Sequence, residues 1–437
     1  MKNEKTKAHS FVPGVAESRL HAMAGDDCSL HFDLEELTPK QQRDHEENQA
    51  LTGMLQLALI GIGNSGDHFA LFDEFGLPDW ASLLEHYQEC YGAMGLYVAK
   101  DSDISFHPRD NFYESVAENW TSVTDCKLIN LYMVSGGNQL LHQSSNALQV
   151  SKNVNSKVHF AEHAPQFGLP VPDTLCTECD QLGSAVVEDF FSRHNNQVML
   201  KLLGLAGSRN VIPVNSVAMA VDYTAEYSGD MPVLLQHQLD TTDWQEMTVD
   251  LTITDESVEI SNVRRILFSD GQWVGNQLGE RVQLQEKHRS QLLRVGEYAR
   301  HHGYSAAEGL NCGIDYFVRG DDVLITEINA RWTGGLFPAE YCRRLDTHRN
   351  AIAFFDMVRR DRIEDITRFQ RDHLFNTRKS AEYAYIPMGF SPYTNVVDDI
   401  EYVYLWQLVV GDFSAFQRHI AHSFEPGVFL VAPGINV

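Results

Sequence analysis

One polar-faced hairpin constrains the fold of this 437-residue chain more than any other feature of the sequence. Residues 312–327 form two apolar, β-prone runs separated by a short polar turn, which is typical of a β-hairpin. Side chains of a strand alternate between two faces, so Glu327, Asn329 and Arg331 should project on the same face. Pairing of the two strands can bring Asp315 opposite that face. The sequence therefore predicts a surface on which two carboxylates, an amide and a guanidinium converge.

This set of side chains indicates a magnesium site. Mg²⁺ usually takes one or two protein carboxylates together with phosphate oxygens and water. Asp315, Glu327 and Asn329 are therefore candidate metal ligands, and Arg331 could hold an anionic oxygen beside them. An exposed polar face on a surface hairpin would show the same alternation, so the hairpin alone does not decide the question.

A candidate phosphate contact lies upstream of the hairpin. The apolar strand of residues 197–200 ends at Lys201 and enters a glycine-containing turn. Backbone amides near Gly204, Gly207 and Ser208 could approach phosphate oxygens, for which the lysine supplies a point charge. A single lysine at a strand end is more often a solvated surface residue. The interpretation therefore depends on the neighbouring motifs.

Composition excludes several classes of function. The chain has 34 basic and 60 acidic residues and a formal net charge of -26, so neither nucleic acid nor an anionic membrane is an expected partner. The length favours two to four packed units. Seven irregularly spaced cysteines do not form a disulfide framework. No apolar stretch approaches the length of a membrane span and no signal sequence opens the chain, so a cytoplasmic location is expected.

The first third of the sequence is typical of an alternating α/β unit with a parallel sheet. Residues 54–60 are expected to form a buried strand that leads through the glycine turn 61–66 into a helix, and residues 95–99 and 128–134 are further expected strands. The glycine spacing also fits a dinucleotide-binding turn. No acidic residue ends a second strand about twenty residues later, which disfavours a nicotinamide site.

The remaining segments of the sequence alternate between expected strands and expected helices. Several strand-like pieces predict a small α+β unit over residues 198–259, and residues 281–302 read as a charged helix. The stretch from 341 to 369 is expected to be helical.

Taken in order, these motifs resemble the ATP-grasp superfamily of ligases, over about residues 151–335. The resemblance rests on Ser151-Lys152, Gly168-Leu-Pro-Val-Pro172, Val198-Met-Leu-Lys201, Gln236-His-Gln-Leu239, Asp315 and Glu327-Ile-Asn-Ala-Arg331. It implies an α/β chain with the ATP-grasp fold, in which two α+β lobes sandwich ATP, preceded by a Rossmann-like domain. The implied domains are 1–150 for the N-terminal domain, 151–350 for the ATP-grasp domain with its small lobe at about 175–240, and 351–437 for a C-terminal extension.

The resemblance also implies roles for individual residues. The nucleotide-binding set is Lys152, Lys201, Gly204, Gly207, Ser208, Gln236, His237 and Leu239. The implied metal ligands are Asp315, Glu327 and Asn329, and the implied catalytic groups are Lys201 and Arg331. Arg264 and Arg265, together with Arg331, would hold a substrate carboxylate, although an exposed strand edge explains the first two equally well.

The implied reaction is ATP-dependent joining of a carboxylate to an amine through an acyl phosphate, with release of ADP and phosphate. ATP and Mg²⁺ are the expected cofactors, and Mn²⁺ could replace the magnesium. The expected partners are small-molecule carboxylate and amine substrates. Dimers are common in the superfamily, and by that analogy a homodimer is one expected state. Two alternatives remain: an ATP-dependent carboxylase or thioester-forming synthetase, and a non-catalytic nucleotide-binding protein.

Overall fold

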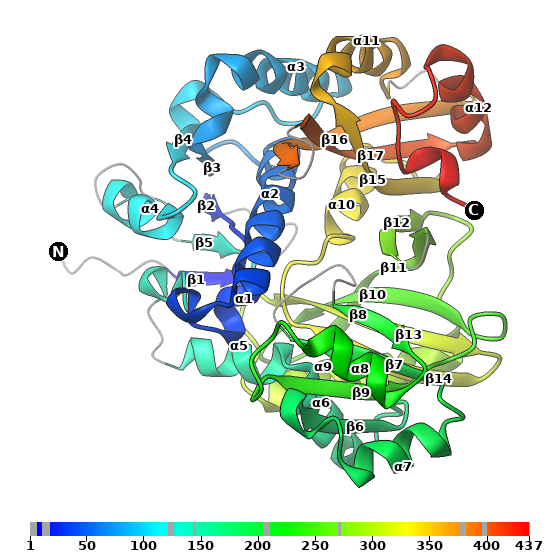
Figure 1. Ribbon diagram of the computed structural model, residues 1–437. Coiled ribbons are helices and arrows are strands. Elements are labelled where there is room, and N and C mark those ends of the chain that lie inside the picture. The colour runs from blue at the N-terminus through cyan, green and yellow to red at the C-terminus, as the bar shows by residue number, and fades with distance from the viewer. Residues whose placement is uncertain are drawn as a thin grey trace.

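In the part of the chain that the structure describes, three β-sheets are flanked by helices (Figure 1). This computed structural model describes residues 7–10, 18–120, 126, 128–142, 146–203, 210–269, 272–375, 382–395 and 400–436. The turn that contains Gly204, Gly207 and Ser208 lies outside the described residues, so its closure over phosphates stays a prediction. No helix in the described ranges is both long and apolar enough to cross a membrane.

The N-terminal sheet is parallel and has the strand order β1-β5-β2-β3-β4. Its strands are β1 (Lys7–Ser10), β2 (Arg19–Ala22), β3 (His68–Phe72), β4 (Ile104–His107) and β5 (Leu128–Leu131). Its helices are α1 (Asp26–His31), α2 (Pro39–Gly61), α3 (Pro78–Met94) and α4 (Phe112–Trp120). The parallel α/β unit predicted for the first third is thus confirmed. The strand order reverses between β2 and β5, because β3 and β4 follow β2 on one side whereas β5 lies on the other.

The expected strand at residues 54–60 is wrong, because these residues form the second half of α2. The helix begins at Pro39 and is capped by Thr38, whose hydroxyl accepts from the backbone N–H of Gln41 in a capping box. Figure 1 shows α2 as the long blue helix through the middle of the molecule. Because this part of the helix is buried almost all round, it carries no polar stripe and reads as a continuous apolar run.

The glycine turn at residues 61–66 therefore leads from a helix into β3, the reverse of the order that a dinucleotide fingerprint requires. Side chains pack closely around it: a Cβ added at Gly61 would lie 2.3 Å from the hydroxyl of Tyr341. The strand expected at 95–99 is also absent, because Gly95 ends α3 in the left-handed region (φ 80°) and β4 begins only at Ile104.

The second sheet is antiparallel and has the order β14-β13-β10-β11-β12-β15-β17-β16. Its strands are β10 (Gln245–Ile253), β11 (Val258–Ser269), β12 (Gln272–Leu278), β13 (Leu310–Arg319), β14 (Asp322–Asn329), β15 (Ala351–Arg359), β16 (Tyr383–Asn395) and β17 (Ile400–Gly411). The predicted hairpin is β13–β14, and Asp315 pairs opposite Glu327 as expected. Helix α9 (Glu286–His301) covers the apolar face, where Leu292 and Val295 share a core with Val249.

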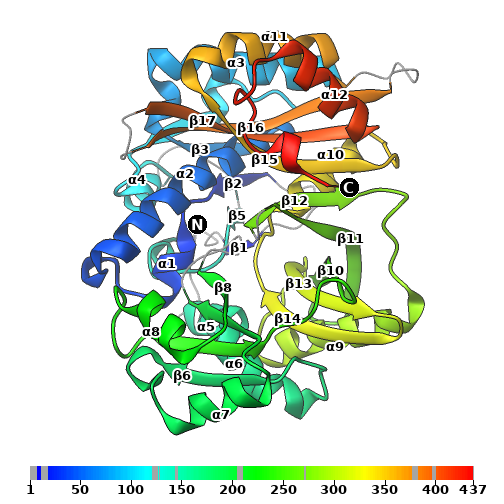
Figure 2. The same cartoon turned by 45° about the vertical axis from the view of Figure 1, so that its right-hand side comes forward.

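The third sheet is small and antiparallel, with the order β6-β9-β7-β8. Its strands are β6 (Thr174–Glu178), β7 (Val198–Leu202), β8 (Val211–Val214) and β9 (Pro232–His237). Helices α7 (Ala185–Arg193) and α8 (Val217–Thr224) pack on one face around Leu200 and Leu235. The predicted unit over residues 198–259 was too long at its end, because β10 and β11 belong to the large sheet. Figure 2 shows the small sheet beside β13 and β14 in the lower half of the molecule.

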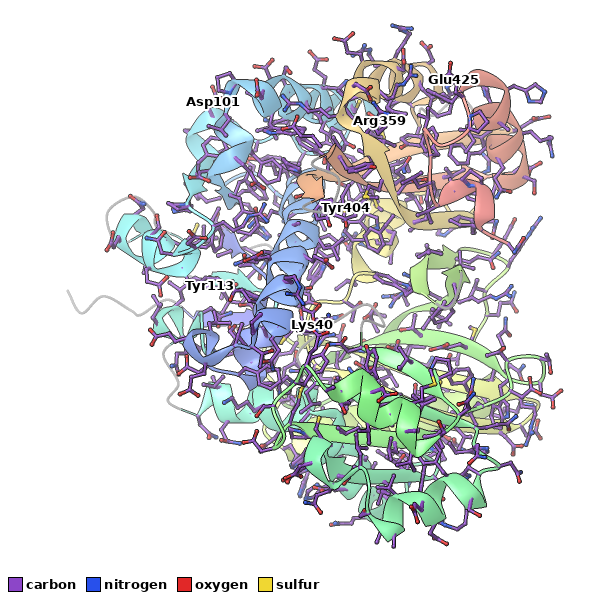
Figure 3. All side chains as sticks on the ribbon, in the orientation of Figure 1. Lys40, Asp101, Tyr113, Arg359, Tyr404 and Glu425 are labelled. Atoms are coloured by element: carbon purple, nitrogen blue, oxygen red, sulfur yellow. The ribbon has the colours of Figure 1, made fainter. Side chains whose placement is uncertain are left out.

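Two helices connect the N-terminal sheet to the small one: α5 (Ala147–Asn155) and α6 (Lys157–His163). The small-sheet unit also contacts α2, where the Tyr227 hydroxyl donates to Oδ2 of Asp44 (3.3 Å). Lys40, labelled in Figure 3, lies over the ring of the same tyrosine at 5.9 Å.

The helix expected from 341 to 369 is interrupted by β15, because residues 351–358 form an apolar strand in the middle of the large sheet. The helices here are α10 (Leu336–Arg344), α11 (Ile363–His373) and α12 (Phe413–Ser423). Leu57 and Phe72 share one hydrophobic core with Phe354 and Trp406, so the two ends of the chain pack together. The predicted division of the chain into three consecutive domains stays a prediction, and the first and last of these segments share this core.

Candidate active site

The polar face of the large sheet lies opposite the face that α9 covers. Alternation places Val249 and Ile314 in the core under α9, whereas Thr248 and Asp315 face the other way. Because Thr248 pairs with Asp315 and Asp315 with Glu327, three neighbouring strands present polar groups to one surface. The sequence folds in this way because its polar and apolar residues alternate with the period of a strand.

The hairpin carboxylates lie against an amide. Nδ2 of Asn329 donates to Oδ2 of Asp315 at 3.0 Å, while Oδ1 of Asn329 is buried and has no hydrogen-bond partner among the described residues. Burial and the neighbouring Glu327 raise the pKa of Asp315 to about 6. Two like charges held this close, beside a free amide oxygen, fit the binding of a cation.

Two lysines face the hairpin from the other side. Nζ of Lys157, on α6, lies 2.8 Å from Oε1 of Glu327. Lys201, on β7, is buried with 7% of its surface exposed, and burial lowers the pKa of its ammonium group. Burial alone would raise the pKa of Glu327, but Lys157, Lys201 and Arg331 together hold it below its usual value. The pairing therefore keeps Glu327 ionised in a buried site.

Sequence reasoning missed Lys157 and also Glu246. Glu246 lies on β10, two residues before Thr248 and on the same face. Burial and the charge of Asp315 raise its pKa to about 8. The alternating polar positions of β10 could have revealed it, and the signal for Lys157 was a second lysine shortly after Lys152.

The donor set fits Mg²⁺. Within the described residues no group of three or more His, Cys, Asp and Glu side chains could hold a metal ion. Asp315, Glu327 and Asn329 instead supply two carboxylates and an amide oxygen, which suits an ion that completes its shell with phosphate oxygens and water. Zinc sites usually need more nitrogen or sulfur ligands from the protein.

The residues expected to contact the nucleotide base fall on two faces of the small sheet. Gln236 pairs with Met199 and Thr174, and its Nε2 donates to the Thr174 hydroxyl at 3.0 Å. It shares a face with Lys201, because both lie opposite the core-facing positions of β7 and β9. His237 points to the other face, where its ring stacks on His194 at 4.5 Å. The structure thus places Gln236 on the same face as Lys201, and it places His237 on the opposite face.

Two other predicted contacts lie at the edge of this arrangement. Leu239 follows the end of β9 and is half-buried. Lys152, on α5, is near enough to His31 to lower the pKa of that imidazole, after burial and the charges of Lys157 and Arg331. The ion pair with Glu327 is made by Lys157, and not by the lysine that the resemblance singles out, among the contacts of the described residues.

Arg264 and Arg265 project to opposite faces of β11. Arg264 is 1% exposed, forms an ion pair with Asp250 and lies against Gly335, where an added Cβ would come within 2.0 Å of its Nε. Asp250 also accepts from the Thr333 hydroxyl at 2.7 Å. Arg264 is therefore enclosed beneath the polar face, whereas Arg265 is only partly buried on the other side.

Arg331 connects the hairpin to the N-terminal sheet. Its Nη1 lies 3.4 Å from Oδ1 of Asp27, and its guanidinium lies over the ring of Tyr132 at 5.4 Å. Asp27 and His31 come from α1, directly after β2. Sequence reasoning assigned no role to this region, although two adjacent aspartates after a strand of a parallel sheet are a usable signal.

Comparisons with known proteins agree on the fold. No protein-family model matches the chain, and no curated protein matches it significantly in sequence. Three solved structures superpose over nearly the whole chain. The N5-carboxyaminoimidazole synthase of Aspergillus clavatus, in complex with ADP and 5-aminoimidazole ribonucleotide, has a TM-score of 0.53 at 10% identity and covers 93% of this chain and 98% of its own. The phosphoribosylamine–glycine ligase of Thermotoga maritima has a TM-score of 0.52 at 12% identity, with coverages of 96% and 97%.

The L-amino acid ligase of Bacillus licheniformis has a TM-score of 0.50 at 10% identity, with coverages of 93% and 96%. These proteins are ATP-grasp ligases, and the chain has their fold. At identities of 10–12% the fold is what the chain shares with them. The predicted ATP-grasp architecture is therefore confirmed.

Proposed function

We propose that the chain is an ATP-dependent carboxylate–amine ligase that forms an amide or peptide bond through an acyl phosphate. The observation that supports this most is the meeting of Lys157, Lys201, Glu327, Asp315 and Arg331 between the small and large sheets. A protein without nucleotide chemistry has no evident need for two largely buried lysines against a pair of carboxylates, because each buried charge costs desolvation energy.

The chemistry follows from the residues in place. A carboxylate is a poor acyl donor because its leaving group would be oxide. Attack of a carboxylate oxygen on the γ-phosphorus of ATP forms a new P–O bond and breaks the bond to the bridging oxygen, so ADP leaves. The amine then attacks the acyl carbon, the C–O bond to phosphate breaks, and the amine proton passes to solvent. The net products are the amide, ADP and phosphate.

Each group has a defined part in this scheme. Lys157 and Lys201 would contact phosphate oxygens, and Arg331 would hold the carboxylate and then the developing oxyanion. Mg²⁺ bound by Asp315, Glu327 and Asn329 would offset the negative charge of the phosphates. Gln236 would accept from the adenine amino group through its amide oxygen.

The direct test is ADP and hydroxamate formation from Mg-ATP, hydroxylamine, and pools of amino acids and other carboxylates. Wild type should release ADP and form a hydroxamate, and Glu327→Gln should do neither while keeping its fold. Glu425→Gln is a matched control, because Glu425 is exposed at the far end of the molecule from the small sheet (Figure 3). A protein that fails to bind ATP would contradict the proposal.

The same experiment separates the alternatives. An ATP-dependent carboxylase would release ADP with bicarbonate and an amine, and a thioester-forming synthetase would do so with a thiol. A non-catalytic nucleotide-binding protein would bind Mg-ADP and show no turnover with any pool. Product analysis by mass spectrometry assigns the outcome.

A further inference from the structure

The hairpin alone does not fix the direction of the Arg331 side chain. Arg331 lies two residues beyond the end of β14, where strand pairing no longer sets the direction of a side chain. Its backbone is held, because Nδ2 of Asn311 donates to the Arg331 carbonyl oxygen at 2.7 Å. The side chain is buried, and its Nε has no hydrogen-bond partner among the described residues. The orientation of the guanidinium therefore depends on the groups around it.

The ion-pair partner of Arg331 comes from α1 and not from the hairpin. Among the ion pairs of the described residues, Arg331 pairs with Asp27, whose Oδ1 lies 3.4 Å from Nη1. The hairpin carboxylates have partners of their own: a lysine Nζ lies 2.8 Å from Glu327, and an amide Nδ2 lies 3.0 Å from Asp315. Burial lowers the pKa of Arg331, but Tyr132 and then Asp27, Glu327 and Asp315 raise it above its usual value. The hairpin carboxylates are thus within electrostatic reach of the guanidinium without pairing with it.

Asp27 is a firmly held support for this guanidinium. It lies in the first turn of α1, is buried, and its Oδ2 accepts from Nδ2 of Asn48 on α2 at 3.1 Å. Helix α1 packs so closely on α2 that a Cβ added at Gly25 would lie 3.1 Å from the backbone nitrogen of Gln49. The neighbouring Asp26 accepts three side-chain hydrogen bonds, at 2.6, 2.9 and 3.2 Å. The carboxylate of Asp27 therefore has a fixed position.

Tyr132 supports the guanidinium as a second group. It directly follows β5 and is buried, and the guanidinium carbon of Arg331 lies 5.4 Å from the centre of its ring, within the range of a cation–π contact. The backbone N–H of Trp332 donates to the Tyr132 carbonyl oxygen at 3.1 Å, which joins the two segments. The segments that follow the neighbouring strands β2 and β5 thus both contact the guanidinium.

We infer that Asp27 is a positioning residue of the active site, which keeps the Arg331 guanidinium from pairing with the metal-binding carboxylates and leaves it available to the substrate carboxylate. The inference rests on the proposed function for the role of Arg331, whereas the coupling between Asp27 and Arg331 can be measured without turnover. After Asp27, the carboxylates that act most on the guanidinium are Glu327 and Asp315. Without Asp27 the guanidinium would pair with them, which would occupy the proposed Mg²⁺ ligands and withdraw the guanidinium from the substrate.

A purely structural role for Asp27 predicts a different pattern of effects. A carboxylate that only joins α1 to the rest of the molecule would, when changed, reduce activity whatever residue stands at position 331. A positioning residue acts through Arg331, so its effect disappears once the guanidinium is gone. A double-mutant cycle distinguishes these two cases.

The cycle is measured in the ADP and hydroxamate assay, with a carboxylate that is active in the pooled assay. Asp27→Asn keeps an oxygen that can accept from Asn48 and removes the charge that pairs with the guanidinium. We expect it to lower kcat/KM for the carboxylate about tenfold or more and to change KM for ATP by less than about twofold. Arg331→Met should cost about 100-fold or more, and adding Asp27→Asn to it should cost less than about twofold more. Asp101→Asn, which removes the same charge at an exposed position (Figure 3), should behave as wild type.

Calorimetric titration of ADP at a series of Mg²⁺ concentrations provides a second readout, which needs no turnover. In Asp27→Asn the Mg²⁺ concentration required for half of the maximal ADP affinity should rise about tenfold, because the guanidinium competes for Glu327 and Asp315. This rise should be absent when Asp27→Asn is combined with Arg331→Met. The calorimetric cycle stays measurable where Arg331→Met leaves too little activity for kinetics.

Asn48→Ala provides a second variant in case Asp27→Asn does not fold. It retains the carboxylate of Asp27 but removes its support, so both effects should appear in smaller measure and again disappear with Arg331→Met. Losses that multiply in the double variant, or an Mg²⁺ dependence that is the same in Asp27→Asn and wild type, overturn the inference and leave the ligase proposal standing. Absence of ADP release with every carboxylate, while the shift in Mg²⁺ dependence is observed, overturns the ligase proposal alone.

Discussion

Nζ of Lys157 lies 2.8 Å from Oε1 of Glu327 and joins α6 to the β13–β14 hairpin. The two side chains are 11% and 19% exposed, so the pair is largely removed from water and each charge depends on the other. This contact connects the segment between the sheets to the proposed metal-binding strand. It also distinguishes Lys157 from Lys152, which the resemblance favours.

We expect Lys157→Ala to reduce kcat for ADP release by about 100-fold or more, the usual effect of removing a positioned charge from an active site. Lys152→Ala is the matched control on the preceding helix and should cost less than about tenfold, because the ion pair with Glu327 is made by Lys157. Both are measured at saturating carboxylate and hydroxylamine. Equal losses in the two variants would restore Lys152 as the main phosphate contact.

The two faces of β9 predict opposite effects on nucleotide binding. Gln236→Ala should weaken ADP binding roughly tenfold, the worth of about one hydrogen bond. His237→Ala should change it by less than about twofold, because the ring stacks on His194 on the other face and supplies no hydrogen bond to the nucleotide. Isothermal titration of Mg-ADP into each variant measures both. A larger loss for His237→Ala would contradict the assignment of the faces.

The hairpin residues could be found from the sequence because strand alternation is a local property. Glu327 and Asn329 share a face of β14 by this alternation, whereas Arg331 lies two residues beyond the end of the strand. The turn alone would pair Asp315 with Thr326, and a register shift between Asp315 and Tyr316 brings Glu327 opposite Asp315 instead. Asp27 could not be found in this way. Its contact with Arg331 depends on how the N-terminal sheet packs against the hairpin, which no local pattern encodes.

Two of the errors in the fold have the same physical origin. Patterns of polarity report which side of an element faces water, and they fail where an element is buried on all sides. Residues 54–60 of α2 and residues 351–358 of β15 are both enclosed in the core that the two ends of the chain share. The capping box at Thr38 was a local signal that could have corrected the first error.

Glu246 predicts a pH dependence of stability. Its folded pKa is raised from 4.5 to about 8, chiefly by burial and then by Asp315. A raised pKa contributes stability that is complete below the unfolded value and is lost as pH rises through the folded value. The ligand-free wild type should therefore become less stable than Glu246→Gln as pH increases from about 5 to about 8.

Thermal unfolding of both proteins across this range measures the effect. The control is Glu259→Gln, which removes an exposed carboxylate on β11. The difference in Tm between Glu246→Gln and wild type should be smallest near pH 5 and grow toward pH 8. A difference that stays constant over the range would show that Glu246 ionises as it does in the unfolded chain.

Substitutions in the buried pair Arg264–Asp250 test whether Arg264 positions Arg331 or binds the substrate itself. Asp250 accepts from Thr333, and Asn311 donates to the backbone carbonyl of Arg331 at 2.7 Å while lying against the same aspartate at 3.4 Å. If this network holds Arg331 in place, Arg264→Met should lower kcat and also raise KM for the carboxylate, because Arg331 is the group proposed to hold that carboxylate.

The same variant should lose on the order of 3–5 kcal/mol of stability, because it leaves a buried carboxylate without its cation. Removing both charges in Arg264→Met with Asp250→Asn should cost less than the sum of the single changes, since no unpaired charge then remains. Arg265→Met, the same substitution on the opposite face, is the control and should alter neither kcat nor stability strongly. A rise in KM for the carboxylate in Arg264→Met, with kcat and stability unchanged, would instead mean that Arg264 reaches the substrate, as the resemblance implies.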